Sequence, residues 1–219
     1  MKTLSVLSCK GGTGKTTLAL HLAVAAQAAG RGVLVADLDR QRSAVDWRRE
    51  RDSLRPNVEE AKPGSLWTLQ QAATRLGSDV MIIDTASSRE EDSAYAIKCA
   101  DLCLIVLRPN FLDLKAVVGS AQAVLNQNTT GVFVVNQAPA GAGMMSEVMQ
   151  APRPYGLPIA PIRIRQRNAY QQGLGEGRTA QEIEPMGPAA EEMAALWYYV
   201  DSLLWPAHGE HEPLLAQTA

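Results

Sequence analysis

The chain has 219 residues, 46% of them hydrophobic, and its 21 basic and 23 acidic side chains give a formal net charge of −2. This length fits one domain with a sizeable core, and the near balance of charge gives no general sign of a nucleic-acid or membrane partner. No apolar run approaches the roughly 18 residues of a membrane-spanning helix, and no signal-peptide pattern is present, which predicts a cytoplasmic protein.

Apolar runs alternate with helical patterns along the chain. Strands are expected at 4–7, 33–36, 80–83, 102–107, 132–135 and 159–164, and helices near 15–29, 42–54, 67–76, 90–99, 111–127 and 187–204. Continuous apolar runs are typical of parallel strands that are buried on both faces. The pattern predicts a single α/β domain over residues 1–205, a mostly parallel twisted sheet with helices on both faces. Residues 138–158 are expected to form a loop with one short helix, and 206–219 a disordered tail.

The stretch SCKGGTGKTT, residues 8–17, joins the first expected strand to the first expected helix. Its glycines let the backbone turn with N–H groups facing inward, above a helix N-terminus that carries partial positive charge. The letters match the deviant Walker A pattern K-G-G-x-G-K-T-T in full. This predicts a P-loop NTPase in which Lys15 contacts the β- and γ-phosphates of ATP and Thr16 ligates Mg²⁺. The expected ATP-binding residues of the loop are Lys10, Gly11, Gly12, Thr13, Gly14, Lys15, Thr16 and Thr17.

Acidic residues follow two other expected strands. Asp37 and Asp39 close the second strand, and Asp84 closes the third. Ligands bind at the carboxyl ends of such strands, and a phosphate site with Mg²⁺ needs carboxylates near the metal and near the attacking water. Asp39 and Asp84 are therefore predicted to join Thr16 at the metal. Capping of the following helix is the alternative for each acid, and it weighs most for Asp37.

Five stretches, taken together and in this order, resemble the ParA/MinD ATPases: KGGTGKTT, DLDRQRSAVDW, IIDTA, RPNFLDL and IRIRQRNAYQQGLGEGRTAQE. The likeness runs over most of residues 3–183. It is greatest to the small ParF-like plasmid-partition ATPases, which lack an N-terminal helix-turn-helix domain. The chain departs from the family at Arg40, where proline is usual, and at 85–88, which lack the usual proline or glycine. Both departures concern the switch loops and the rate of hydrolysis.

The resemblance implies roles for individual residues. Lys10 matches the signature lysine that reaches the phosphates of the partner subunit. Asp39 matches the acid that positions the attacking water, and Asp84 the Walker B aspartate, which holds Mg²⁺ through water. Asn136 matches the asparagine that contacts adenine, with a simple turn residue as the alternative, and Asp113 matches an acidic position of the family. The expected catalytic residues are thus Lys10, Lys15 and Asp39.

The same resemblance implies a cycle. The chain is expected to hydrolyse ATP to ADP and phosphate with Mg²⁺, to form a homodimer on ATP and to separate after hydrolysis. Family members of this kind bind DNA nonspecifically as the ATP dimer and are released by a ParB-type centromere-binding adaptor. We therefore expect a role in plasmid or chromosome segregation, in the cytoplasm at the nucleoid. Positioning of a protein cargo by the same cycle is the alternative.

Two further functions on this fold can be compared with the sequence. A MinD-like membrane-associated switch needs a basic amphipathic C-terminal helix, whereas residues 189–204 carry acids and no basic residue, so no membrane partner is expected. An iron–sulfur protein needs paired cysteine ligands. The three cysteines, Cys9, Cys99 and Cys103, form no such pair and predict free thiols.

A basic segment is the expected DNA-binding surface. Residues 153–178 hold five arginines and one acid, and no lysine or arginine follows them. In the sequence IRIR, a strand would turn its isoleucines into the core and its arginines outward, because side chains alternate between the two faces. The alternative is that these arginines pair with acids of the C-terminal helix. The candidate DNA-binding residues are Arg163, Arg165, Arg167 and Arg178.

Overall fold

The protein is built on one parallel β-sheet. The computed structural model describes residues 1–86, 90–139, 148, 150 and 153–206. The strands are β1 Lys2–Leu7, β2 Val33–Asp37, β3 Asn57–Glu60, β4 Val80–Asp84, β5 Leu102–Leu107 and β6 Thr130–Val135. They lie in the order β3-β2-β4-β1-β5-β6, and every pair is parallel. This architecture confirms the predicted α/β fold class.

The register of the central strands brings three sequence motifs to one edge of the sheet. Val6 in β1 lies opposite Asp84 in β4, and Asp84 lies opposite Asp37 in β2. The phosphate loop begins two residues after Val6, so it starts level with the ends of β2 and β4. The candidate acids and the loop therefore share the carboxyl edge of the sheet, where ligands bind in open α/β folds.

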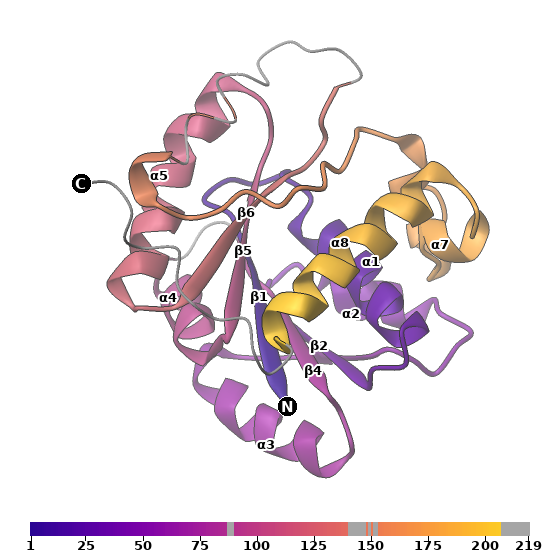
Figure 1. Cartoon of the computed structure of the whole chain (residues 1–219). Helices are drawn as coiled ribbons and strands as arrows, with labels where there is room; N and C mark the ends of the chain where they lie inside the picture. Colours follow the sequence, from indigo (N-terminus) through magenta and orange to yellow (C-terminus); the bar gives the residue numbers. More distant parts are fainter. Residues whose placement is uncertain (87–89, 140–147, 149, 151–152, 207–219) are drawn as a thin grey trace.

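Helices cover both faces of the sheet (Figure 1). One face carries α1 Lys15–Ala28, α2 Ser43–Arg49, α7 Ala180–Ile183 and α8 Pro188–Leu204, and the other carries α3 Leu66–Arg75, α4 Glu90–Cys99 and α5 Phe111–Asn126. Two hydrophobic cores result, one under each layer. Most helices match their expected ranges within a single residue, but α2 ends at Arg49, earlier than expected.

The last helix, α8, packs along α1 on one face of the sheet. Its apolar side is buried in the core, which agrees with its expected packing role. Within the described residues, no helix has the length and apolarity needed to cross a bilayer. The buried residues of α8 are Ala189, Ala190, Met193, Leu196, Trp197, Val200 and Leu204.

Two segments differ from the prediction. Residues 159–164 do not form a strand, because Pro158 and Pro161 cannot donate ladder hydrogen bonds. Only isolated bridges occur there, from Ile159 to Phe133 of β6 and from Arg165, just beyond the segment, to Ala138. The sheet instead contains β3, a strand that the sequence did not predict. It lies at an edge of the sheet, and its sequence, NVEE, is mostly exposed and contains no apolar run. Most of 138–158 and of the predicted tail lies outside the described residues; a 3₁₀ turn at Arg153–Tyr155 is described.

Candidate functional site

The phosphate loop owes its shape to two glycines. Gly12 and Gly14 have φ angles of 73° and 87°, in the left-handed region that glycine enters without strain. Gly14 also packs closely against the end of β6, where a Cβ atom would lie 2.5 Å from Asn136 Nδ2. A larger residue at Gly14 would therefore push the loop and β6 apart.

Lys15 begins α1 directly under this loop. Its side chain is 7% exposed, and its Nζ donates a hydrogen bond to the Lys10 carbonyl oxygen at 3.4 Å. Burial lowers the pKa of Lys15, while the nearby carboxylates of Asp84 and Asp39 act to raise it. The sequence-predicted lysine and both predicted acids thus act on one another electrostatically.

Asp84 is the buried acid of this group. Neither of its carboxylate oxygens accepts a hydrogen bond from any residue that the structure describes. Burial raises the pKa of Asp84 to about 7, although the Lys15 ammonium and the nearby Thr16 hydroxyl, which stays outside hydrogen-bond geometry, lower it. Buried carboxylate oxygens without partners are costly, and a hydrated Mg²⁺ ion is a partner they suit. Asp84 and Thr16 therefore fit the predicted metal.

The described residues contain no cluster of three His, Cys, Asp or Glu side chains that could hold a metal alone. Mg²⁺ in phosphate sites commonly takes one or two protein ligands and completes its shell with water and phosphate oxygens. The small ligand set at Asp84 and Thr16 suits an ion that arrives with a nucleotide.

The two acids after β2 differ in their surroundings. Asp37 is 1% exposed, and its Oδ2 accepts the N–H groups of Ala44 and Val45 at 3.0 and 3.2 Å, so it caps the first turn of α2. Asp39 is half-buried, and its Oδ1 accepts the Gln41 N–H at 3.0 Å. Asp39 also raises the pKa of Asp84. The structure therefore gives Asp37 a capping role, while the metal role of Asp39 stays a prediction, which its electrostatic effect on Asp84 supports.

A charged cluster lies beside the loop. The Asp113 side chain is 3% exposed and accepts hydrogen bonds from Arg108 Nε and Nη2 at 2.7 and 3.2 Å, and Lys10 Nζ lies 3.5 Å from Asp113 Oδ1. Arg108 Nη1 donates to the Gly12 carbonyl oxygen at 3.3 Å. Burial acts to raise the pKa of Asp113, but Arg108 and Lys10 outweigh it and lower that pKa. Sequence reasoning missed Arg108, whose one signal is a cation directly after a strand and five residues before an acid.

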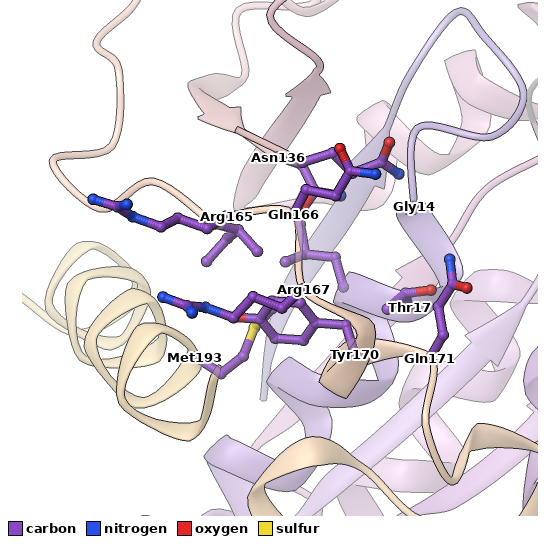
Figure 2. Close-up of a pocket in the computed structure, with 12 residues that line it drawn as sticks. Gly14, Thr17, Asn136, Arg165, Gln166, Arg167, Tyr170, Gln171 and Met193 are labelled. Carbon is purple, nitrogen blue, oxygen red and sulfur yellow. The ribbon is translucent and has the colours of Figure 1, made fainter. Parts of the chain in front are cut away.

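A hollow opens on the opposite side of the loop, toward α8. Figure 2 shows Asn136 facing Tyr170 across it, with Gly14 and Thr17 on one side and the side chains of Arg165 and Arg167 extending toward α8. Asn136 is 6% exposed, and its Nδ2 donates to the Thr13 carbonyl oxygen at 2.7 Å, which fixes the amide. The structure thus brings Asn136 to the phosphate loop, 123 residues away in sequence.

The Tyr170 side of this hollow is held by a network that sequence reasoning missed. The Tyr170 hydroxyl donates to Glu192 Oε2 at 2.7 Å, and Arg167 donates to Glu192 Oε1 through Nη2 at 2.7 Å and Nε at 3.1 Å. The His21 ring of α1 meets the Tyr170 ring edge-on at 5.2 Å. His21 is neutral at ordinary pH, because burial lowers its pKa to about 4. These contacts join α1 and α8 around Tyr170.

The four candidate DNA-binding arginines are not equivalent. Arg163 and Arg165 are exposed while Ile164 between them is 1% exposed, so the predicted alternation is present. Arg167 is half-buried and pairs with Glu192, as the alternative for these arginines foresaw. Arg178 is exposed, and its Nη2 donates to a backbone carbonyl oxygen of α7 at 3.1 Å.

Known proteins share this sequence pattern and fold. The CobQ/CobB/MinD/ParA nucleotide binding domain matches residues 4–179. The chain is 31% identical to the maintenance of carboxysome distribution protein A of Gloeobacter kilaueensis over 182 residues, 80% of this chain and 82% of that relative. It is 26% identical to the protein of the same name from Halothiobacillus neapolitanus over 204 residues, 87% and 91% of the two chains. The septum site-determining protein MinD of Pyrococcus horikoshii, solved with Mg-ADP, has the same fold, with a TM-score of 0.74 at 18% identity over 92% of this chain and 96% of MinD.

Proposed function

This chain belongs to the CobQ/CobB/MinD/ParA family of nucleotide-binding domains, and we propose that it positions a protein cargo inside the cell through cycles of ATP binding and hydrolysis. It is a P-loop ATPase of the ParA/MinD type, with ATP as substrate and Mg²⁺ as cofactor. The predicted family, fold class, ATPase activity and cofactors are thereby confirmed.

The observation that supports a protein cargo is the 31% identity, over 80% of the chain, to a relative named for carboxysome distribution. The second curated relative carries the same name. Plasmid or chromosome partition with a ParB-type adaptor, the main sequence prediction, has weaker support than its alternative. In the proposed cycle, an adaptor on the cargo stimulates hydrolysis and takes the place of a ParB-type protein.

The site residues divide the work on the nucleotide. The loop backbone and Lys15 hold the phosphates, and Asn136 contacts the base beside Tyr170. The Thr16 hydroxyl and Asp84 are the residues that would hold Mg²⁺, which would supply neutralisation of phosphate charge. Asp39 orients the attacking water beside the γ-phosphate.

Dimerisation is the step that makes this chemistry a switch. Members of the family generally dimerise on ATP, and we propose that Lys10 of each subunit reaches the phosphates of its partner. Lys10 lies before Gly11, too early in the loop to take the place of Lys15. A cation supplied by the partner stabilises charge on the γ-phosphate, as an arginine finger does in other NTPases. Loss of the γ-phosphate then removes the group that both subunits hold, and the dimer separates.

We propose that the ATP-bound dimer binds nonspecifically to DNA while it positions the cargo. Arg163, Arg165 and Arg178 are the exposed cations of the proposed DNA surface, whereas Arg167 is occupied by Glu192. Replacing Arg163 and Arg165 by Ala should weaken binding to all duplex sequences alike, and the log–log salt slope should flatten by about 0.9 per lost phosphate contact. Arg48→Ala serves as the control. An unchanged slope in the double variant would place the DNA surface elsewhere.

An experiment in cells that encode the chain separates the two cargoes. With Lys15→Ala in place of the native chain, the protein cargo should collapse into clusters while plasmids are inherited at the normal rate. Evenly spaced protein assemblies together with plasmid loss would overturn the proposed cargo and favour DNA partition.

A further inference from the structure

One buried carboxylate beside the phosphate loop serves two cations. The Asp113 side chain is 3% exposed, whereas those of Lys10 and Arg108 are 32% and 29% exposed. Both cations approach Asp113 Oδ1, Arg108 through Nη2 at 3.2 Å and Lys10 through Nζ at 3.5 Å. The cluster is therefore anchored at its buried acid and open to solvent at its cations.

Asp113 holds Arg108 more strongly than it holds Lys10. Arg108 makes a fork of two hydrogen bonds to Asp113, and its third nitrogen reaches the Gly12 carbonyl oxygen at 3.3 Å. This geometry ties Arg108 to α5 and to the phosphate loop at once. Lys10 meets Asp113 at the longer distance, on an oxygen that Arg108 already occupies. Planar, bidentate arginine–carboxylate pairs are the stronger kind.

We propose that Arg108 is a positioning residue for dimerisation, which keeps Asp113 paired so that Lys10 is able to leave it. The inference rests on the proposed function, in which Lys10 acts on the partner's nucleotide. Leaving a buried carboxylate without a counter-ion is strongly unfavourable. With Arg108 in place, the departure of Lys10 removes only the weaker of two partners. Without Arg108, Asp113 would hold Lys10 in its own subunit and oppose the dimer.

The test measures the dimer dissociation constant by sedimentation with a non-hydrolysable ATP analogue. Arg108→Gln should raise that constant about tenfold, a typical coupling between contacting residues. Asp113→Asn, which removes the negative charge that Lys10 meets in its own subunit, should dimerise at least as tightly as the native chain. The double variant should behave like Asp113→Asn, because Arg108 has no carboxylate charge left to neutralise once Asp113 is replaced. Native dimerisation of Arg108→Gln, or a double variant as weak as Arg108→Gln, would overturn the inference.

A Lys10→Ala background gives a second reading that does not depend on the folding of the Asp113 variant. Arg108→Gln should weaken the dimer no further when Lys10 is already absent, whereas a merely structural role of Arg108 would add its own loss. Additive losses overturn the inference and leave the proposed cycle intact. Native dimerisation and hydrolysis by Lys10→Ala alone would instead overturn the trans role of Lys10, and this inference with it. Thermal unfolding and ATP titration of each monomer check that the fold and the loop are preserved.

Discussion

On the phosphate side of the proposed nucleotide site, one buried carboxylate, that of Asp84, lacks a hydrogen-bond partner among the described residues, whereas the carboxylate of Glu192 on the base side is paired. Asp84 is fully buried, and among the described residues neither oxygen accepts a hydrogen bond. Glu192, beside the base hollow, accepts hydrogen bonds from the Arg165 backbone, twice from Arg167, and from Tyr170. Both carboxylates lie beside the nucleotide site that we propose, and of the two only Glu192 is satisfied by described residues of the protein.

This difference indicates that the phosphate side carries the chemistry, whereas the base side has a structural role. A buried charge without a partner destabilises the ligand-free protein, and a site keeps such a charge where a ligand completes it. A satisfied network instead fixes the shape of the surface against which a base can lie. Substitutions on the phosphate side should therefore change function more than stability, and substitutions on the base side the reverse.

The largest effect is expected for Lys15→Ala. ATP affinity should fall at least about 100-fold, or ~3 kcal/mol, because a charge-assisted contact to phosphate is lost. Calorimetric titration measures the affinity, and thermal unfolding should stay cooperative. The exposed Lys62→Ala variant is the control. Native ATP affinity in Lys15→Ala would show that Lys15 does not bind the phosphates and would contradict the functional role of the phosphate side.

Asp39→Ala should bind ATP normally and hydrolyse it about 100-fold or more slowly, because a group that positions the reacting water is removed. The ATP dimer should consequently be long-lived in light scattering. Asp46→Ala, an exposed acid on the adjacent helix that pairs with Arg49, is the control and should keep native turnover. If Asp39→Ala hydrolyses ATP at the native rate, another acid orients the water.

Glu192→Gln tests the base side. It should destabilise the protein by roughly 1–3 kcal/mol at pH 7, because Arg167 and Tyr170 lose a charged partner. Burial acts to raise the pKa of Glu192, but Arg167 and Tyr170 outweigh it and lower that pKa from its ordinary 4.5. The stabilisation is therefore present above pH 4.5 and is lost as the pH falls below it.

Chemical denaturation across this pH range measures the effect of Glu192→Gln, and the exposed Glu191→Gln variant is the matched control. Equal stability of the two variants at pH 7 would mean that the network around Tyr170 is not a scaffold.

The smallest effect is expected for Asp84→Asn in the ligand-free protein. At pH 8 the variant should be more stable than the native chain by about 1 kcal/mol, because a buried charge without a partner is removed. Burial raises the pKa of Asp84 from its ordinary 3.8 to about 7, so the gain should be complete above pH 7 and should fade as the pH falls from 7 toward 3.8, where the unfolded chain also takes up the proton. Asp52→Asn, an exposed acid, is the control. A loss of stability at pH 8 would show that Asp84 is satisfied in the free protein.

Most of the fold could be read from the sequence because its central strands are continuous apolar runs. β4 and β5 are buried along their whole length, and runs such as VMIID and LCLIVL announce such strands. β3 could not be found this way, because its pairing with β2 is made by the backbone while its side chains, apart from the half-buried Val58, are exposed. The strand prediction at 159–164 was wrong for the opposite reason. The segment has apolar residues, but its prolines leave too few N–H groups to form the hydrogen bonds of a strand.

The candidate site divides in the same way. The loop and the acids after β2 and β4 could be found because each is a local pattern at the end of a strand. The Arg108 fork and the pairing of Arg167 with Glu192 could not, because a sequence does not state which distant charge an arginine meets. Tyr170 lies within a stretch that resembles the family, but its place in the hollow beside Asn136 depends on contacts with α1 and α8 and could not be predicted.

The sequence by itself determined the phosphate loop, the central strands with the helices between them, and the edge of the sheet at which the acids gather. These follow from local periodicity and from glycines that only certain turns require. Only the tertiary structure decided that Asp37 caps α2, that Asp84 is left without a described partner, and that Asp113 holds two cations. Such pairings depend on burial and on contacts between residues far apart in the chain, and both are set when the two helical layers close over the sheet.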